Sequence, residues 1–206
     1  MNNYKNPSVV LLPNPVGIDK AIQDIQNKLS SLNWIEKIYG RAFLEKERKF
    51  PNEADNHITD FDGNRPREII YPMIYGINQE PLNVMPNDLL KSQLFFLLND
   101  PQSYPQYEAM VDTGQVQTNV SMIFWGNLKK INPAKNYRFT EELKLEMINL
   151  LLLKCPSFII NEIFEEHDEV FSGMTLLETY RQYLKFPFTG FKISGQLNYY
   201  SPHNKC

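Results

Sequence analysis

Apolar residues near the start of the chain follow a helical spacing. Five of them lie alternately four and three residues apart, with polar side chains between: Ile18, Ile22, Ile25, Leu29 and Leu32. This spacing gathers them on one face and predicts an amphipathic helix. A second helix is predicted for residues 139–154, with one broad apolar face, Thr140 as its N-terminal cap and a proline just after its end.

A period of two residues predicts strands elsewhere. Residues 188–200 alternate apolar and polar side chains, as in a strand with one face in water. Residues 120–128, within the longer run 116–130, carry bulk on both sides, which favours a central strand covered on both faces. Further strands are predicted for residues 34–47, 68–75, 81–85 and 91–98. The proline at position 72 indicates a sheet edge or a bulge.

The remaining segments predict an arm and connections. Residues 1–17 contain three prolines, which favour an extended arm. Residues 50–67 and 100–115 have the turn-rich composition of long surface loops. Residues 157–172 begin apolar and become acidic, and both a strand with a charged tip and a short helix fit them. Residues 175–185 predict a helix opened by a capping box.

The chain has 206 residues, which suits one full-sized core. We expect residues 18–206 to form a single α+β domain, with a mostly antiparallel sheet and one or two helices packed on one face. The formal net charge of −3 gives no basic field for nucleic acid or an anionic membrane. Cys155 and Cys206 cannot make a disulfide framework, and no apolar run approaches a membrane span. We expect synthesis in the cytoplasm.

No motif for catalysis, metal binding or phosphate binding stands out. The chain lacks a glycine-rich phosphate loop, and its three histidines, His57, His167 and His203, lack the spacing of zinc ligands. Residues 60–64 resemble the start of a calcium loop, but the glycine falls fourth instead of sixth and Tyr71 occupies the twelfth position. A solvated turn is the favoured interpretation. We expect no catalytic residue, no metal and no cofactor.

Three other groups have competing interpretations. Cys155 and His167 have the chemistry of a thiol and its base, but Cys155 follows a leucine-rich run and favours simple packing. Adjacent carboxylates usually mark a solvated face, and here they are Glu165, Glu166, Asp168 and Glu169. An apolar run in the arm is either a strand of its own subunit or a segment that docks on a neighbour by strand addition. Its residues are Val9, Val10, Leu11 and Leu12.

Four segments carry a family resemblance. They are residues 71–76 (Tyr-Pro-Met-Ile-Tyr-Gly), 82–88 (Leu-Asn-Val-Met-Pro-Asn-Asp), 123–131 (Ile-Phe-Trp-Gly-Asn-Leu-Lys-Lys-Ile) and 185–193 (Lys-Phe-Pro-Phe-Thr-Gly-Phe-Lys-Ile). With the order of the predicted elements, they resemble tail terminator and tail-completion proteins of tailed bacteriophages, and phage-derived proteins of Bacteroides-type hosts. The resemblance covers most of residues 18–200. The loop at 50–67 departs from the compact terminator pattern and leaves open a different ring of the neck.

The resemblance implies a structural protein of the virion without enzymatic activity. It would form a hexameric or dodecameric ring between head and tail, in contact with portal, neck or tail proteins, and DNA would pass through the ring without sequence-specific binding. In such a ring we expect the four carboxylates at 165, 166, 168 and 169 to line the channel and residues 9–12 to lie at the subunit interface. The alternatives are an assembly adaptor or chaperone absent from the mature particle, and an enzyme with dispersed Asp, Glu and His residues.

Overall fold

The computed structural model describes residues 7–49, 67–76, 80–99, 115–175 and 184–200. Within these residues, eight strands form one sheet in the order β4-β3-β2-β5-β6-β8-β7, with β1 paired to β2. The strands are β1 (Ser8–Val9), β2 (Lys37–Lys49), β3 (Arg67–Tyr75), β4 (Pro81–Asn83), β5 (Ser92–Leu98), β6 (Gln115–Asn127), β7 (Phe158–Phe164) and β8 (Phe188–Tyr200). The helices are α1 (Gly17–Leu29), α2 (Leu128–Ile131), α3 (Thr140–Lys154) and α4 (His167–Val170).

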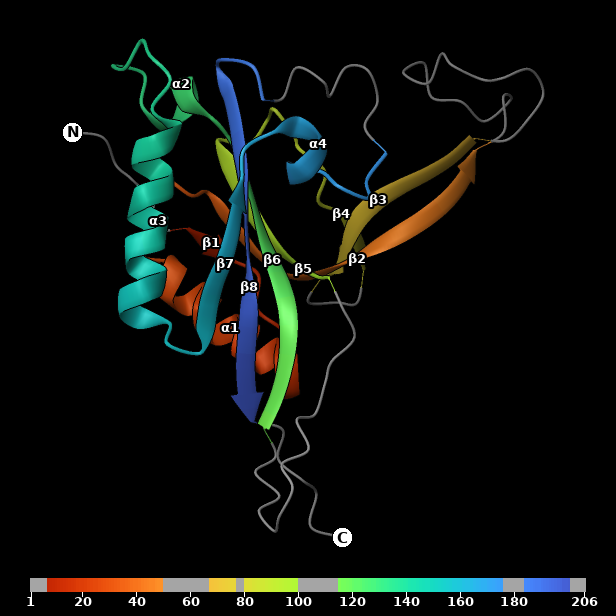
Figure 1. The fold of residues 1–206 in the computed structure, drawn as a ribbon. Helices are drawn as coiled ribbons and strands as arrows, with labels where there is room; N and C mark the ends of the chain where they lie inside the picture. The colour runs from red at the N-terminus through yellow and green to blue at the C-terminus, as the bar shows by residue number, and fades with distance from the viewer. Residues whose placement is uncertain (1–6, 50–66, 77–79, 100–114, 176–183, 201–206) are drawn as a thin grey trace, which may run out of the picture.

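The described part of the chain has the expected α+β fold. The β1–β2 and β2–β5 pairings are parallel, and the other five pairings are antiparallel. The helices α1 and α3 lie on the same side of the sheet (Figure 1). A mostly antiparallel sheet with two helices on one face is therefore confirmed.

The longest ladder joins β6 to β8 over 13 residues of each strand without a register shift. Along β8, Phe191, Ile193 and Leu197 are buried against the helices. The alternate residues Lys192, Ser194 and Gln196 face the other way. On β6, Phe124 and Trp125 are both fully buried but belong to cores on opposite faces. The alternation predicted for the final strand is confirmed, since its more exposed residues lie on one face. The central strand is covered on both faces, as predicted.

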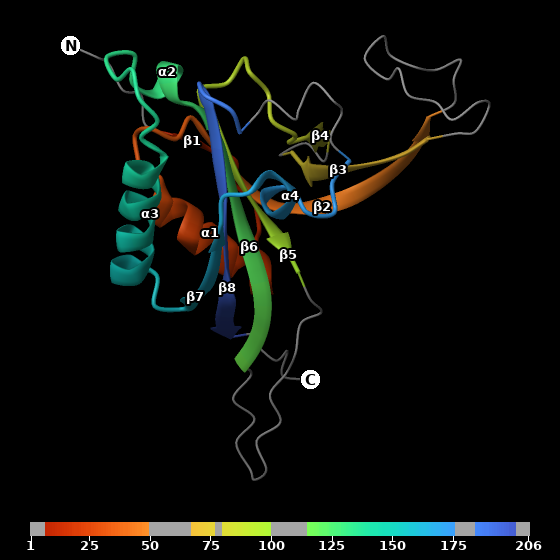
Figure 2. The same ribbon diagram turned by 45° about the horizontal axis from the view of Figure 1, so that its top comes forward.

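The larger core lies between the sheet and the two long helices (Figures 1 and 2). α1 contributes the stripe that includes Ile22 and Leu29, and α3 contributes Met147 and Leu151, all fully or nearly fully buried. Burial of each such side chain is worth about 1.5–3 kcal/mol. Both predicted helices are confirmed, because their apolar faces are the ones that meet the sheet.

A smaller core covers part of the opposite face, near α4. Trp125 stacks on Phe188 with ring centroids 5.5 Å apart, and Val170 and Phe171 belong to the same cluster. α4 lies on the side of the sheet away from α1 and α3 (Figures 1 and 2). Residues 157–172 were predicted to form either a strand with a charged tip or a short helix. They form both, because the strand β7 is followed by the short helix α4.

β2 changes partner along its length. Its first half, up to Ala42, pairs with β5, and its second half, from Phe43, pairs with β3. The register shifts between Ile38 and Arg41. This irregularity explains why residues 34–47 follow no single period. The outer half of β2 and β3 form a ribbon that projects away from the helices (Figure 2).

Two predicted helix and strand ends differ from the structure. The strand predicted for residues 120–128, within the run 116–130, stops at Asn127. The Oδ1 of Asn127 accepts hydrogen bonds from the backbone N–H groups of Lys129 (3.1 Å) and Lys130 (3.3 Å) and so starts α2. Thr140 does not cap α3. It is the first residue of that helix, and its buried Oγ1 lies 2.7 Å from Oγ1 of Thr189 on β8.

The proline at position 72 does not lie on an outer strand, because β3 sits between β2 and β4. Val84 N–H donates to the Pro72 carbonyl (3.0 Å), but proline has no N–H to return the bond. The Val84 carbonyl accepts instead from Nε2 of Gln93, at 2.7 Å, and Gln93 is buried. A side chain thus replaces the missing backbone donor.

The loops predicted at 50–67 and 100–115 and the helix predicted at 175–185 fall mostly outside the described residues.

We predict that Gly195→Ala destabilises the fold by about 1–3 kcal/mol, the usual cost of overpacking. A Cβ at Gly195 would lie 2.3 Å from the Ile159 carbonyl oxygen and 2.6 Å from the Phe158 ring. The control is Gly40→Ala, because a Cβ there meets nothing closer than the Gln26 amide at 3.9 Å, so we expect a gain of about 0.5 kcal/mol from the stiffer unfolded chain. Urea unfolding measures both. Equal midpoints for the two variants would contradict the packing at Gly195.

Candidate functional site

Three surfaces of the described chain are candidates for function. The first is a pocket of about 400 Å³ on one edge of β2, which we call the edge pocket. β1 pairs with the beginning of β2 and β3 with its end, and the pocket opens between them. Its lining residues are Val10, Leu12, Pro13, Asn14, Asp19, Gly40, Arg41, Phe43, Ile74 and Tyr75.

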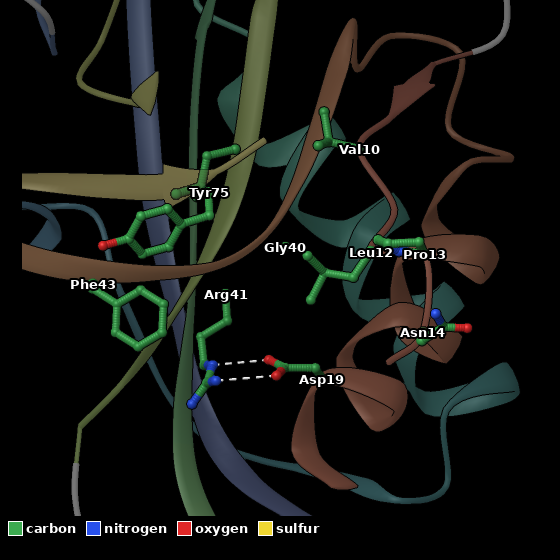
Figure 3. A pocket seen from close by; sticks show the side chains of 10 residues that line it. Val10, Leu12, Pro13, Asn14, Asp19, Gly40, Arg41, Phe43 and Tyr75 are labelled. Carbon is green, nitrogen blue, oxygen red and sulfur yellow. Dashed lines mark hydrogen bonds and ion pairs between the residues drawn. The ribbon is translucent and has the colours of Figure 1, made fainter. Parts of the chain in front are cut away.

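An ion pair lies at one side of the edge pocket (Figure 3). Arg41 Nη2 donates to Asp19 Oδ2 at 3.0 Å, and Arg41 Nε lies 2.8 Å from Asp19 Oδ1 in an ion pair without a hydrogen bond of its own. Each side chain is 21% exposed. The Arg41 guanidinium also lies 4.7 Å from the centroid of the Phe43 ring. These contacts hold the guanidinium in one orientation.

The N-terminal segment is fixed beside this pocket by Gln26. Its buried amide donates from Nε2 to the carbonyl oxygens of Val10 (3.1 Å) and Ile38 (3.4 Å), while Val10 N–H donates to Ile38 O (2.9 Å). Phe43 and Tyr75 pack at a ring distance of 6.3 Å, and each is more than two-fifths exposed. The pocket therefore has an aromatic wall and an apolar wall on either side of the ion pair.

The second surface lies where α3 meets the outer edge of β7. β7 ends the strand order, so no described residue pairs with its outer edge. Exposed apolar residues flank this edge, and we call them, with their half-buried neighbours, the flank patch. It comprises Leu145, Ile148 and Leu152 of α3 and Ile160 and Ile163 of β7.

The contacts of α3 show which of its sides faces β7. Lys144 makes an ion pair with Glu165 just after β7, and Ile148 and Leu152 follow Lys144 at spacings of four. Glu146 instead accepts from Trp34 Nε1 at 2.8 Å, on the side of α3 that also carries Leu153, seven residues on. Leu152 is 64% exposed and Leu153 81% exposed. Leu152 therefore borders the β7 edge, and Leu153 points away from it.

The third surface is the polar face of β6 and β8 opposite the helices. Ser121 and Ser194 lie opposite each other, with their Oγ atoms 2.7 Å apart, and Asn99 donates to Ser121 Oγ at 2.8 Å. Lys192 lies 4.5 Å from the Phe164 ring centroid. Burial lowers the pKa of Lys192, while the carboxylates of Glu169 and Glu162 act in the opposite direction. A cavity of about 280 Å³ lies here.

The apolar run of the arm lies near the edge pocket. Val9 pairs with Ile38 of the same chain, and Val10 and Leu12 line the pocket. Of the two interpretations of this run, the structure contains the strand in the chain's own sheet. Whether residues 9–12 also contact another subunit stays a prediction.

The four carboxylates predicted to line a channel surround α4. Glu165 is half-buried and pairs with Lys144, whereas Glu166, Asp168 and Glu169 are exposed at the start of the helix. Acidic side chains are favoured at a helix N-terminus. Three of the four are therefore exposed and present their carboxylates at the surface, and their position in a channel stays a prediction.

Cys155 is buried at the end of α3, where burial raises the pKa of its thiol. His167 belongs to α4, where its Nδ1 lies 3.2 Å from Asp168 Oδ1 and its ring packs on Phe171. None of the described contacts joins Cys155 to His167, and the described residues contain no group of three or more His, Cys, Asp or Glu side chains placed to hold a metal. Residues 60–64, His57 and His203 lie outside the described residues.

The sequence prediction did not identify Arg41 or the flank patch. Arg41 belongs to a segment whose apolar residues follow no period, so the sequence did not show which way its side chain points. Nothing in the sequence links it to Asp19, which lies in a separate helix. The sequence did contain a signal for the flank patch, because the four consecutive leucines at 150–153 point to all sides of the helix. A helix that is apolar all round is normally buried on all sides, so exposed leucines there indicate a contact surface.

No family model, curated protein or solved structure matches the chain. Among the described helices, none is both long enough and apolar enough to cross a membrane.

We predict that Lys192 has a pKa below the ordinary lysine value of about 10.4 and that Glu162→Gln lowers its pKa further, because that carboxylate favours the ammonium form. The ε-carbon NMR shifts of the lysines, followed against pH, measure both effects, with Lys192→Arg used to assign the signal. Since the folded pKa is below the unfolded value of about 10.4, the unfolded chain binds more protons between the two values and stability rises with pH in that window. A Lys192 signal that titrates at or above the ordinary lysine value would contradict this.

Proposed function

We propose that this chain is a structural subunit that assembles with copies of itself into a ring of the neck or tail terminator of a tailed phage. In that role it joins the portal or connector to the tail and forms part of the DNA channel. The observation that carries the self-assembly is the unpaired β7 edge beside the flank patch. The assignment to a phage particle is supported by the likeness of residues 71–76, 82–88, 123–131 and 185–193 to neck and tail terminator proteins.

An unpaired strand edge beside exposed apolar side chains favours association. Proteins that remain monomeric usually blunt such edges with charge, proline or a covering element, and contiguous apolar patches normally mark interaction sites. β7 carries one carboxylate along its length, Glu162, and presents Ile159 and Ile163 with 51% and 38% of their surface exposed. We infer that a second copy covers this edge.

A ring forms when each subunit contacts its two neighbours through two different surfaces of its own. When one surface of a subunit binds a different surface of the next, a suitable rotation closes the contacts into a ring. The β7 edge and the β4 edge are at opposite ends of the strand order. Each subunit thus offers two unlike ends to its neighbours.

The exposed acids of α4 suit a surface that DNA passes. Negative side chains repel phosphate and would keep DNA from adhering during transfer. Glu166, Asp168 and Glu169 are exposed, whereas Glu165 is paired with Lys144. The three exposed acids are therefore the ones we assign to the channel.

The main alternative is an assembly adaptor or chaperone that leaves before the particle is complete. Detection of the polypeptide in purified virions separates the two, because an adaptor would be absent. An enzyme that uses dispersed Asp, Glu and His residues is less favoured by the described surfaces, where the edge pocket contains one carboxylate, Asp19, already bound to Arg41.

We predict that Leu152→Glu weakens self-association by about 10- to 100-fold, since burial of a leucine is worth about 1.5–3 kcal/mol and 1.4 kcal/mol is a factor of ten. The matched control is Leu153→Glu, which places the same charge on the adjacent residue but on the side of α3 away from β7. Sedimentation velocity and native mass spectrometry over a range of concentrations measure the effect. Equal assembly of the two variants, in solution and in particles, would contradict the flank patch as the interface.

We predict that lysine at Glu166, Asp168 and Glu169 together slows DNA release, because the exposed negative charge becomes positive. Release from purified particles, followed with a DNA-binding dye at several salt concentrations, measures the rate, and the delay should shrink as salt screens the charges. The matched control reverses three exposed acids elsewhere on the described surface, at Asp24, Glu47 and Asp88. Normal release by the α4 variant would remove these acids from the channel.

A further inference from the structure

One edge of β2 has partners at both ends and none between them. Val9 of β1 pairs with Ile38, and Met73 of β3 pairs with Phe43. The registers and backbone hydrogen bonds of the described residues leave positions 39–42 unpaired on this edge. The distance from position 38 to position 43 along an extended strand is about 16 Å at about 3.3 Å per residue. The edge pocket occupies this gap.

Alternation along the strands shows which backbone groups face the gap. Val84 N–H donates to the Pro72 carbonyl, so Pro72 faces β4 and its neighbour Met73 faces β2. Met73 pairs with Phe43, whose backbone groups therefore face β3. Alternate residues of a strand direct their N–H and C=O groups to the same edge. The backbone groups of Arg41, two residues earlier, thus face the open part of this edge.

The Arg41 side chain offers further donors at the same place. On one side of the guanidinium, Nη2 donates to Asp19 and Nε lies in ion-pair contact with the same carboxylate. A guanidinium has five N–H donors, so those on Nη1 and the second on Nη2 have no acceptor among the described residues. Figure 3 shows this end of Arg41 directed away from Asp19. A carbonyl or carboxylate oxygen would complete it.

The charge balance favours a neutral acceptor. Asp19 already neutralises Arg41, so a second carboxylate would bring an unbalanced negative charge into a partly buried site, at a desolvation cost. A peptide carbonyl brings no charge, and its neighbouring N–H groups can satisfy the open edge of β2. Val10 and Leu12 on one side and Ile74 and Tyr75 on the other form walls for an apolar side chain.

We propose that the edge pocket binds an extended apolar segment, three or four residues long, of a partner protein. The segment fills the gap between β1 and β3 as a short added strand, with one carbonyl on the free N–H groups of Arg41 and one apolar side chain between the walls. Main-chain bonds at a strand edge give affinity, and the side-chain pocket gives specificity. The inference uses the β2 edge and is independent of the ring and of the flank patch.

The test uses an N-acetylated, C-amidated tetrapeptide in which threonine and leucine alternate, titrated into the full chain labelled with ¹⁵N. Backbone amide NMR shifts should change saturably at Gly40, Arg41 and Tyr75. Two control peptides are titrated alongside. In one, proline replaces the inner threonine and removes its N–H, and in the other serine replaces both leucines. We expect each control to bind about tenfold more weakly, the loss from one main-chain bond or one buried leucine.

Variants of the protein complete the experiment. Gly40→Val should weaken binding about tenfold, because Gly40 lines the pocket and a larger side chain there narrows it. An added Cβ meets nothing closer than the Gln26 amide at 3.9 Å. Arg41→Lys keeps a charge for Asp19 but loses the fork of donors and should have a similar effect. Leu44→Ala, at an exposed residue outside the pocket lining, should bind as the wild type does.

Three results would overturn the proposal. They are the absence of a saturable shift, equal binding of the three peptides, and unchanged affinity in both Gly40→Val and Arg41→Lys. Preserved unfolding midpoints in these variants, measured in urea, establish that a loss of binding arises at the pocket and not from loss of the fold.

Discussion

Thirteen residues of β6 pair with thirteen of β8, and the other described elements are arranged around that ladder. Its backbone groups satisfy each other in the centre of the sheet, where an unpaired polar group costs about 1–3 kcal/mol. Because side chains alternate along β6, Phe124 can pack beneath the long helices while Trp125 packs beneath α4. One strand therefore supports both cores, and the positions of α1, α3 and α4 all depend on its register.

Much of this arrangement could be predicted because its signals are local. The spacing of Ile18 to Leu32 and the alternation along residues 188–200 each reflect one element against one core. One prediction was wrong because two groups far apart in the chain meet in the fold. Thr140 has the chemistry of a cap, but a threonine on a distant strand, Thr189, binds its hydroxyl. The strand prediction also missed α2, because the start of that helix depends on one side-chain oxygen, Asn127 Oδ1.

The candidate surfaces were harder to predict for the same reason. The pair of Arg41 and Asp19 joins a strand to a helix, and neither residue has a distinctive sequence context. The gap beside them exists because β1 and β3 use the same edge of β2, which is a property of topology. For α3 the composition carried the information: leucines on every side of a helix cannot all be buried in one core. The sequence thus indicated that α3 has a contact surface, whereas only the fold shows that β7 borders it.

The hydrogen bond from Gln93 to the Val84 carbonyl links three strands through one side chain, since Val84 follows β4, its partner Pro72 lies in β3 and Gln93 in β5. An ordinary residue in place of Pro72 would bring its own N–H to that carbonyl, and the amide of Gln93 would then compete with it for the same lone pairs. The requirement for glutamine at position 93 exists only while proline occupies position 72. In diverging lineages of this chain, the two positions are expected to covary, so that loss of the proline permits an aliphatic residue at 93.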